Sequence, residues 1–252
     1  MSRIPDPSRD ALAGAASCAA VIAASQVPLP YALDLTLAGV RLSVRSNSPS
    51  LVESLSQYYC DFAAVGGEPD LVVHAVDGPS PTIALPFVPH GQGGAKEEYA
   101  DLSDGRVVRK RRTGLWLVFG RASNYILGPC AGRPQQVANC INARFIDRKL
   151  GRGARLIHAA GVALGERGLA LAGFAGAGKS TLALELMRQG ADFVTNDRGL
   201  VSREAGGLFL TGVVRPPRVN PGTILANEAA WPAGGRGTSG LRQSGPWGLV
   251  GP

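Results

Sequence analysis

The chain of 252 residues is long enough for one large domain or two modest ones, and its 45% hydrophobic and 18% charged residues are typical of a globular protein. The net charge of +7 is scattered apart from one run, 106–112, which holds five cations and has no aromatic or helical stripe beside it. These features favour a solvated basic surface and argue against a nucleic-acid-binding arm.

Residues 1–30 are expected to form an Ala-rich helix and a linker. The apolar stretch Ala11–Ser25 has some likeness to a secretory signal, but Asp6 and Asp10 stand where such a signal carries positive charge. We therefore expect a helix capped by Ser8 or Asp10. No run is long and apolar enough to span a bilayer, so no membrane partner is expected.

The four cysteines have no C-x-x-C spacing, which argues against a zinc site or a redox dithiol. Nothing in their positions indicates a disulfide framework. We expect reduced thiols and a cytoplasmic protein.

Residues 31–130 read as an α+β domain of unknown role. Alternating apolar residues in 33–45, divided by Gly39, predict a β-hairpin. Further elements are expected in chain order, with a loop over 77–95: a helix from Pro49 to Tyr59, strands at 71–76, 106–108, 115–119 and 125–127, and a helix from Gln135 to Leu150. The lone His74 and His90 are expected to be structural or surface residues.

A second domain is expected over 131–227, and its motif follows two short strand-like runs, 156–164 and 169–172. The next residues match G-x-x-x-x-G-K-S/T, and a helix follows to Gln189, ended by Gly190. Strand before and helix after are the context that this phosphate-binding loop requires. The expected nucleotide-binding residues are Gly173, Ala175, Gly176, Ala177, Gly178, Lys179, Ser180 and Thr181.

The residue types in this loop suit the terminal phosphates of a nucleotide. Glycines allow several backbone N–H groups to converge on one anion, and the following helix adds the positive end of its dipole. Lys179 is expected to reach the β- and γ-phosphates, and the Ser180 hydroxyl to ligate Mg²⁺. The sequence thus predicts ATP and Mg²⁺ as cofactors.

Asp197 closes the next strand-like run, 192–197. A second magnesium ligand or a catalytic carboxylate is expected at such a strand end, although a solvated loop aspartate is the alternative. The chain has no LSGGQ-type sequence and no N-K-x-D element, so an ABC ATPase and a Ras-type GTPase are not expected.

Residues 156–203 resemble the catalytic core of the HPr kinase/phosphorylase family, and the nearest branch is that of the HprK-related kinases of type B. In that family a histidine precedes the phosphate loop by about fifteen residues, as His158 does here, and a strand after the loop helix ends in two acids, as Asn196-Asp197 does in part. The segment Arg218–Thr223 is also similar. The resemblance extends more weakly over 120–227.

The resemblance implies an α/β fold with a P-loop kinase core, a mixed sheet with helices, preceded by the α+β domain. It implies transfer of the γ-phosphoryl group of ATP to a hydroxyl, most simply a serine of a protein. Asp197 would accept the hydroxyl proton or lie near the metal, His158 would lie near the phosphates, and Lys179 would act on them. Relatives are oligomeric, so a homo-oligomer is an expectation.

Two departures limit what the resemblance carries over. Asn196 replaces the first acid of the family's pair and cannot take a proton, which puts the reverse, phosphorolytic activity in doubt. The segment that helps to hold the protein substrate is not recognisable, so HPr itself is not the expected acceptor.

The Gly/Pro-rich residues 228–252 are expected to be disordered. A shortened chain with impaired activity is a further hypothesis. Three functions stay open: a protein kinase of the HprK-related type, a small-molecule kinase on the same fold, and a non-catalytic ATP-binding sensor.

Overall fold

The computed structural model describes residues 16–64, 66–91, 96–120, 123–174 and 176–215. The chain has a mixed α/β architecture and divides into two compact units, unit 1 (Met1–Ile141) and unit 2 (Asn142–Pro252). The division falls within helix α4 (Pro134–Gly151), whereas the sequence pattern placed the start of the second domain at residue 131. The expected tail 228–252 lies outside the described residues.

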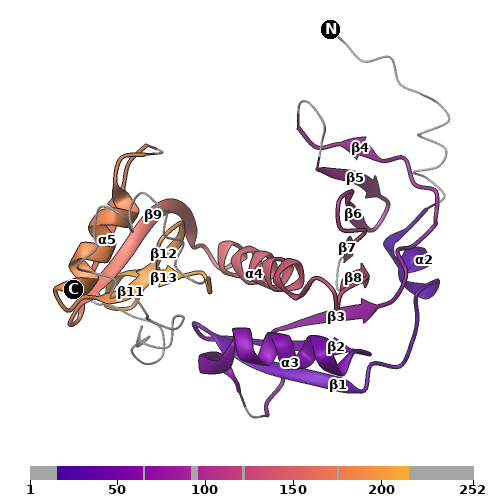
Figure 1. Ribbon diagram of the computed structural model, residues 1–252, viewed down its shortest axis with the longest axis horizontal. Helices are drawn as coiled ribbons and strands as arrows, with labels where there is room; N and C mark the ends of the chain where they lie inside the picture. The colour runs from indigo at the N-terminus through magenta and orange to yellow at the C-terminus, as the bar shows by residue number, and fades with distance from the viewer. Residues whose placement is uncertain (1–15, 65, 92–95, 121–122, 175, 216–252) are drawn as a thin grey trace, which may run out of the picture. The chain divides into compact units, whose positions relative to one another are not determined.

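Unit 1 is built on an eight-stranded mixed sheet with the order β1-β2-β3-β8-β7-β6-β5-β4 (Figure 1). Strands β2, β3 and β8 pair in parallel, and the other neighbours are antiparallel. The strands are β1 (Tyr31–Leu37), β2 (Val40–Ser46), β3 (Leu71–Asp77), β4 (Val88–Pro89), β5 (Glu97–Leu102), β6 (Gly105–Lys110), β7 (Trp116–Gly120) and β8 (Asn124–Gly128).

The β1–β2 hairpin confirms the prediction from alternation. Leu33, Leu35 and Leu37 are buried on β1, and Gly39 makes the turn with φ 76°. Helix α3 (Pro49–Tyr58) begins where expected and packs on both strands. It is followed by the short 3₁₀ helix η1 (Cys60–Phe62).

Helix α2 (Cys18–Ala23) is shorter at its start than expected. Ser17 caps it by accepting a hydrogen bond from the Ala20 amide. The expected caps Ser8 and Asp10 lie outside the described residues. All four cysteines are free thiols, and no helix in the described part of the chain has the length and apolarity needed to cross a membrane.

Strand β5 was not predicted, and it explains the basic run. Its acids face the cations of β6 across the hairpin, so the run is one side of an ion-pair ladder. The pairs are Arg106–Asp101, Arg109–Glu98, Lys110–Glu97 and Arg111–Glu98. Three acids therefore offset part of the positive charge of the run, and the surface there is less basic than the sequence indicated.

Unit 2 contains strands β9 (Arg155–Leu164), β10 (Arg167–Ala172), β11 (Asp192–Thr195), β12 (Arg198–Glu204) and β13 (Gly207–Gly212), with helix α5 (Lys179–Arg188). All strand pairs among its described residues are antiparallel. The expectation of a mixed sheet in this domain was therefore wrong for the described part, because short turns join β9 to β10, β11 to β12 and β12 to β13. The last two strands were not predicted.

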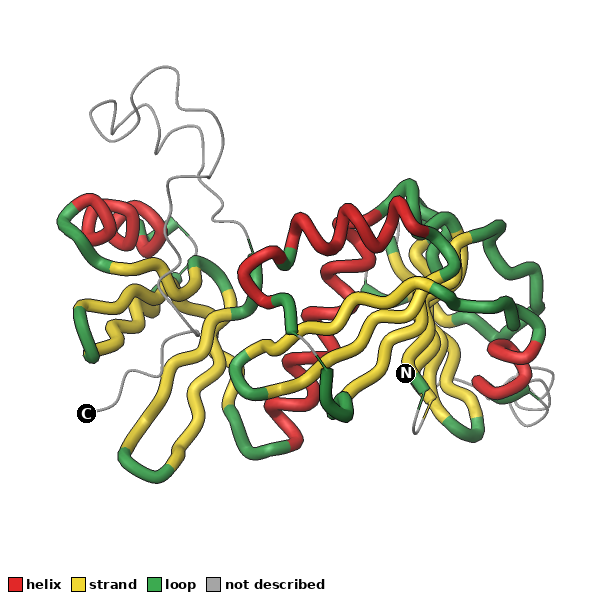
Figure 2. Tube along the Cα trace, turned by 90° about the horizontal axis from the view of Figure 1, so that it is seen from below, coloured by secondary structure: helices red, strands yellow, loops and turns green. Residues whose placement is uncertain are grey.

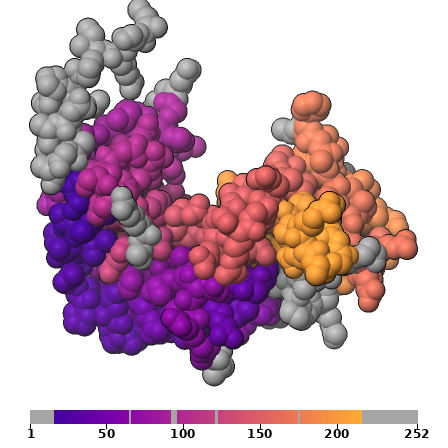
Figure 3. Space-filling model, turned by 180° about the vertical axis from the view of Figure 1, so that it is seen from behind, coloured from indigo at the N-terminus to yellow at the C-terminus, as the bar shows by residue number. Residues whose placement is uncertain are grey.

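Strand β9 carries a small core on each face. On one face Ala160 and Val162 pack with Ala183 of α5, and Figure 2 shows this helix beside the strands. On the other face Ala163 packs with Val194 and Leu210. The β12–β13 hairpin that supplies Leu210 is seen at the surface of unit 2 in Figure 3. Strand β9 thus packs against helix α5 on one face and against the β12–β13 hairpin on the other.

Candidate functional site

The phosphate-binding motif occupies the turn between β10 and α5, as the sequence predicts. Gly176 and Gly178 have φ 81° and 80°, values that only glycine adopts without strain. Ala175 lies outside the described residues. Gly173, Ala177 and Gly178 are exposed, so the backbone of this loop is open to a ligand.

Helix α5 begins at Lys179 with Gly178 as its N-cap, and no side chain caps it. An uncapped helix start offers N–H groups and the positive end of the dipole to an anion. Ser180 and Thr181 follow in the first turn, both half-buried. The loop and helix therefore make an anion-binding geometry.

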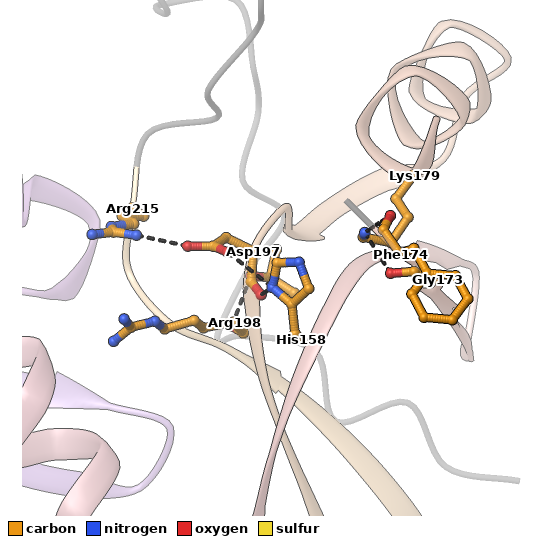
Figure 4. A network of polar contacts seen from close by, with 8 residues as sticks. His158, Gly173, Phe174, Lys179, Asp197, Arg198 and Arg215 are labelled. Carbon is orange, nitrogen blue, oxygen red and sulfur yellow. Dashed lines mark hydrogen bonds and ion pairs between the residues drawn. The ribbon is translucent and has the colours of Figure 1, made fainter. Parts of the chain in front are cut away.

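The ammonium group of Lys179 turns back over the loop. It donates hydrogen bonds to the carbonyl oxygens of Gly173 (2.8 Å) and Phe174 (2.9 Å). Figure 4 shows this contact at the mouth of the loop. The position of the charge is thus fixed by the backbone that would surround a terminal phosphate.

A second polar cluster is centred on Asp197, in the turn between β11 and β12. Its neighbour Arg198 pairs with His158 across β12 and β9, which places the imidazole beside the carboxylate. His158 Nδ1 lies 3.1 Å from Asp197 Oδ1 and 3.1 Å from the Asp197 carbonyl oxygen. Arg215 Nη1 donates to Asp197 Oδ2 over 2.8 Å (Figure 4).

These contacts fix the hydrogen on the His158 ring. Both neighbours of Nδ1, the Asp197 carbonyl oxygen and carboxylate oxygen Oδ1, are acceptors, so Nδ1 is the donor. In the described part of the chain no hydrogen bond or ion pair engages the other nitrogen, Nε2, so it is left for a further partner. The His158 side chain is 62% exposed, so such a partner can reach it.

The structure brings His158 and Asp197 together, and it holds Lys179 separately on the loop. His158 shares its face of β9 with Ala160 and Val162, the face on which α5 packs. Among the described residues, no hydrogen bond or ion pair joins Lys179 to His158 or Asp197. Figure 4 draws His158 between the Asp197 carboxylate and the loop that carries Lys179.

Arg215 was missed by the sequence analysis. It lies just beyond β13, and only the pairing of β12 with β13 returns it to Asp197. No local pattern marks it, because neither strand was predicted. Its half-buried guanidinium lies 2.8 Å from Asp197 Oδ2.

The expected magnesium ligands, Ser180 and Asp197, suit a metal ion that is held partly by the nucleotide and not by the protein alone. Among the described residues, no three His, Cys, Asp or Glu side chains converge on a point that could hold a metal. A nucleotide-bound Mg²⁺ needs only one or two protein ligands, because phosphates and water supply the rest. Ser180 suits that role, and each Asp197 oxygen keeps a lone pair beyond its present bond.

The two other histidines make ring contacts with tyrosines. His74 stacks on Tyr125 with ring centroids 4.4 Å apart, and His90 meets the edge of Tyr99. Neither lies in unit 2.

Comparison with known proteins gives no relative for this chain: no family model matches it, and neither does any curated protein or solved structure. The function must therefore be argued from the site itself.

Proposed function

We propose that unit 2 binds ATP with Mg²⁺ at residues 173–181 and transfers the γ-phosphoryl group to a hydroxyl acceptor, a serine of a protein in the first instance. The observation that carries this proposal is the exposed glycine loop leading into the uncapped start of α5. Its amides and the Lys179 ammonium form a cradle for phosphate oxygens.

Each residue of the second cluster has a role in this proposal. Asp197 would accept the proton of the acceptor hydroxyl, or help Ser180 to hold the metal. His158 would lie near the phosphates with its Nε2 turned to the reactants. Bound Mg²⁺ would neutralise charge on the transferred group.

Nucleotide binding is tested by replacing the lysine of the cradle. Lys179→Ala removes a charge-assisted phosphate contact, so we expect at least about a tenfold loss of affinity for a fluorescent ATP analogue with Mg²⁺. Lys149→Ala, on α4, removes the same charge outside the loop and should bind as the unaltered chain does. Equal affinity of the two variants would refute the assigned role of Lys179.

Transfer is tested separately with Asp197→Ala and γ-labelled ATP. We expect nucleotide affinity to change less than about threefold, while label transfer falls by about 10²-fold or more, the usual range for a lost acid–base group. Label on a protein supports the serine kinase, and label on small metabolites supports a small-molecule kinase.

A non-catalytic ATP sensor is the second candidate. It is favoured by the engagement of both Asp197 carboxylate oxygens, by His158 and by Arg215. In that case the unaltered protein and Asp197→Ala would both bind ATP, and neither of them would transfer label or hydrolyse ATP. The two assays therefore distinguish the candidates.

A further inference from the structure

Unit 1 contains a cavity of about 410 Å³ that is unrelated to the nucleotide site. It lies where β3 and β8 end, at Asp77-Gly78 and Gly128, and the segments 24–27 and 79–83 complete its wall. These two strands are parallel neighbours. Ligands of open sheets commonly bind beyond the carboxyl ends of parallel strands, and the volume is that of a small-molecule site.

The lining is apolar with a few polar groups. Val27 and Ile83 contribute apolar surface, and Ser25, Ser80 and Thr82 contribute hydroxyl groups. Of the described residues that line the cavity, Asp77 alone has an ionisable side chain. A ligand would therefore meet one negative charge and no positive charge.

Asp77 is held firmly in place. The Asn47 side chain accepts from the Asp77 amide over 2.7 Å and donates to its carbonyl over 2.9 Å. The Ala131 amide donates to Asp77 Oδ1 over 2.7 Å. Within the described part of the chain, no hydrogen bond or ion pair engages the other oxygen, Oδ2.

The Asp77 carboxylate also affects the pKa of the neighbouring Cys130 thiol. Burial raises the pKa of Cys130, and the negative charge of Asp77 raises it further. Asp77 is half-buried and fixed by these hydrogen bonds, and among the described residues no ion pair joins its carboxylate to a cation.

We propose that this cavity binds a small organic cation, an amine with a short apolar body. The ammonium group would meet Asp77 Oδ2, the hydroxyl groups would take its remaining N–H donors, and the apolar body would pack on Val27 and Ile83. The Asp77 carboxylate would repel an anion, and a neutral alcohol could not form an ion pair with it.

The test is calorimetric titration of the full chain with matched pairs of ligands: butylamine against butanol, and phenethylamine against phenethyl alcohol. We expect saturable 1:1 binding of an amine at least about tenfold tighter than its alcohol. Asp77→Asn keeps an oxygen for the Ala131 amide but removes the charge, so it should abolish the preference. Asp61→Asn, outside the cavity, removes an equal charge and should keep it.

A second variant protects the test against a folding defect. Val27→Trp fills the cavity from a residue that is 44% exposed, and it should block amine binding while the far-ultraviolet spectrum is retained. The proposal is overturned if amines bind no tighter than alcohols, if they do not saturate, or if both cavity variants bind like the unaltered chain.

Discussion

At the scale of single residues, the half-buried imidazole of His74 links the stability of unit 1 to pH. Burial lowers its pKa from 6.5, and Nδ1 is buried with no hydrogen-bond partner among the residues that the structure describes. The folded state therefore disfavours the proton that the unfolded chain accepts. The neutral ring contributes fully above pH 6.5, and its contribution is lost as the pH falls from 6.5 toward the lowered pKa.

Replacing this residue should flatten the pH dependence. His74→Phe keeps a ring to stack on Tyr125 and removes the titration, so the variant should lose less stability between pH 7 and pH 5. The difference is limited to about a tenfold change in the unfolding equilibrium per pH unit, because one proton is involved. Denaturant unfolding at several pH values measures it, and parallel curves for the two proteins would contradict the assignment.

The same scale shows what sequence reasoning can find in a site. Gly173 to Thr181 were predictable because a phosphate loop is made by consecutive residues. Asp197 was proposed from its place at a strand end and His158 from a resemblance, and the structure places them in contact. Arg215 was not predictable, since its contact with Asp197 depends on two strands that carry no clear alternation.

At the scale of elements, local patterns predicted hairpins and helices but not partners. The β1–β2 hairpin and helices α3, α4 and α5 follow from periodicity and from Gly or Pro at their ends. Strand β5 was not predicted because its charged residues interrupt the alternation of apolar and polar residues. Those charges form ion pairs with β6 across the turn. The stability of β5 comes from a non-local pairing that a single segment cannot reveal.

The ion pairs between β5 and β6 should differ in their contribution to stability, and those of Glu98 should contribute most. The Glu98 side chain is 11% exposed and pairs with both Arg109 and Arg111, whereas Asp101 and Arg106 are 60% and 53% exposed. Glu98→Ala should cost about 1.5–2 kcal/mol, because it removes the charged hydrogen bonds that Arg109 donates to a nearly buried carboxylate. Asp101→Ala should cost less than about 1 kcal/mol, since water screens that pair.

Denaturant unfolding of the two variants checks this difference. Each substitution lowers the free energy of unfolding, and added salt should reduce this loss more for Asp101→Ala than for Glu98→Ala. The reason is that salt screens exposed ion pairs more strongly than buried ones. Equal costs at low salt would show that burial does not set the strength of these pairs.

At the scale of the whole molecule, each unit has cores of its own. Buried residues such as Val107, Trp116 and Leu127 form one in unit 1, while the two faces of β9 carry those of unit 2. The proposed nucleotide loop lies entirely in unit 2, and the cavity lined by Asp77 entirely in unit 1. Ligands of the two sites are therefore expected to stabilise different parts of the chain.

Hydrogen exchange with and without ATP and Mg²⁺ tests this division. Binding to the folded state alone stabilises by about 2.7 kcal/mol at a ligand concentration 100 times Kd. Added protection should concentrate in β9–β13 and α5, with little change in β1–β8, and Lys179→Ala should show none at the same concentration. Equal gains in both units would mean that nucleotide binding is coupled to unit 1, because protection reports the cooperative unit that opens.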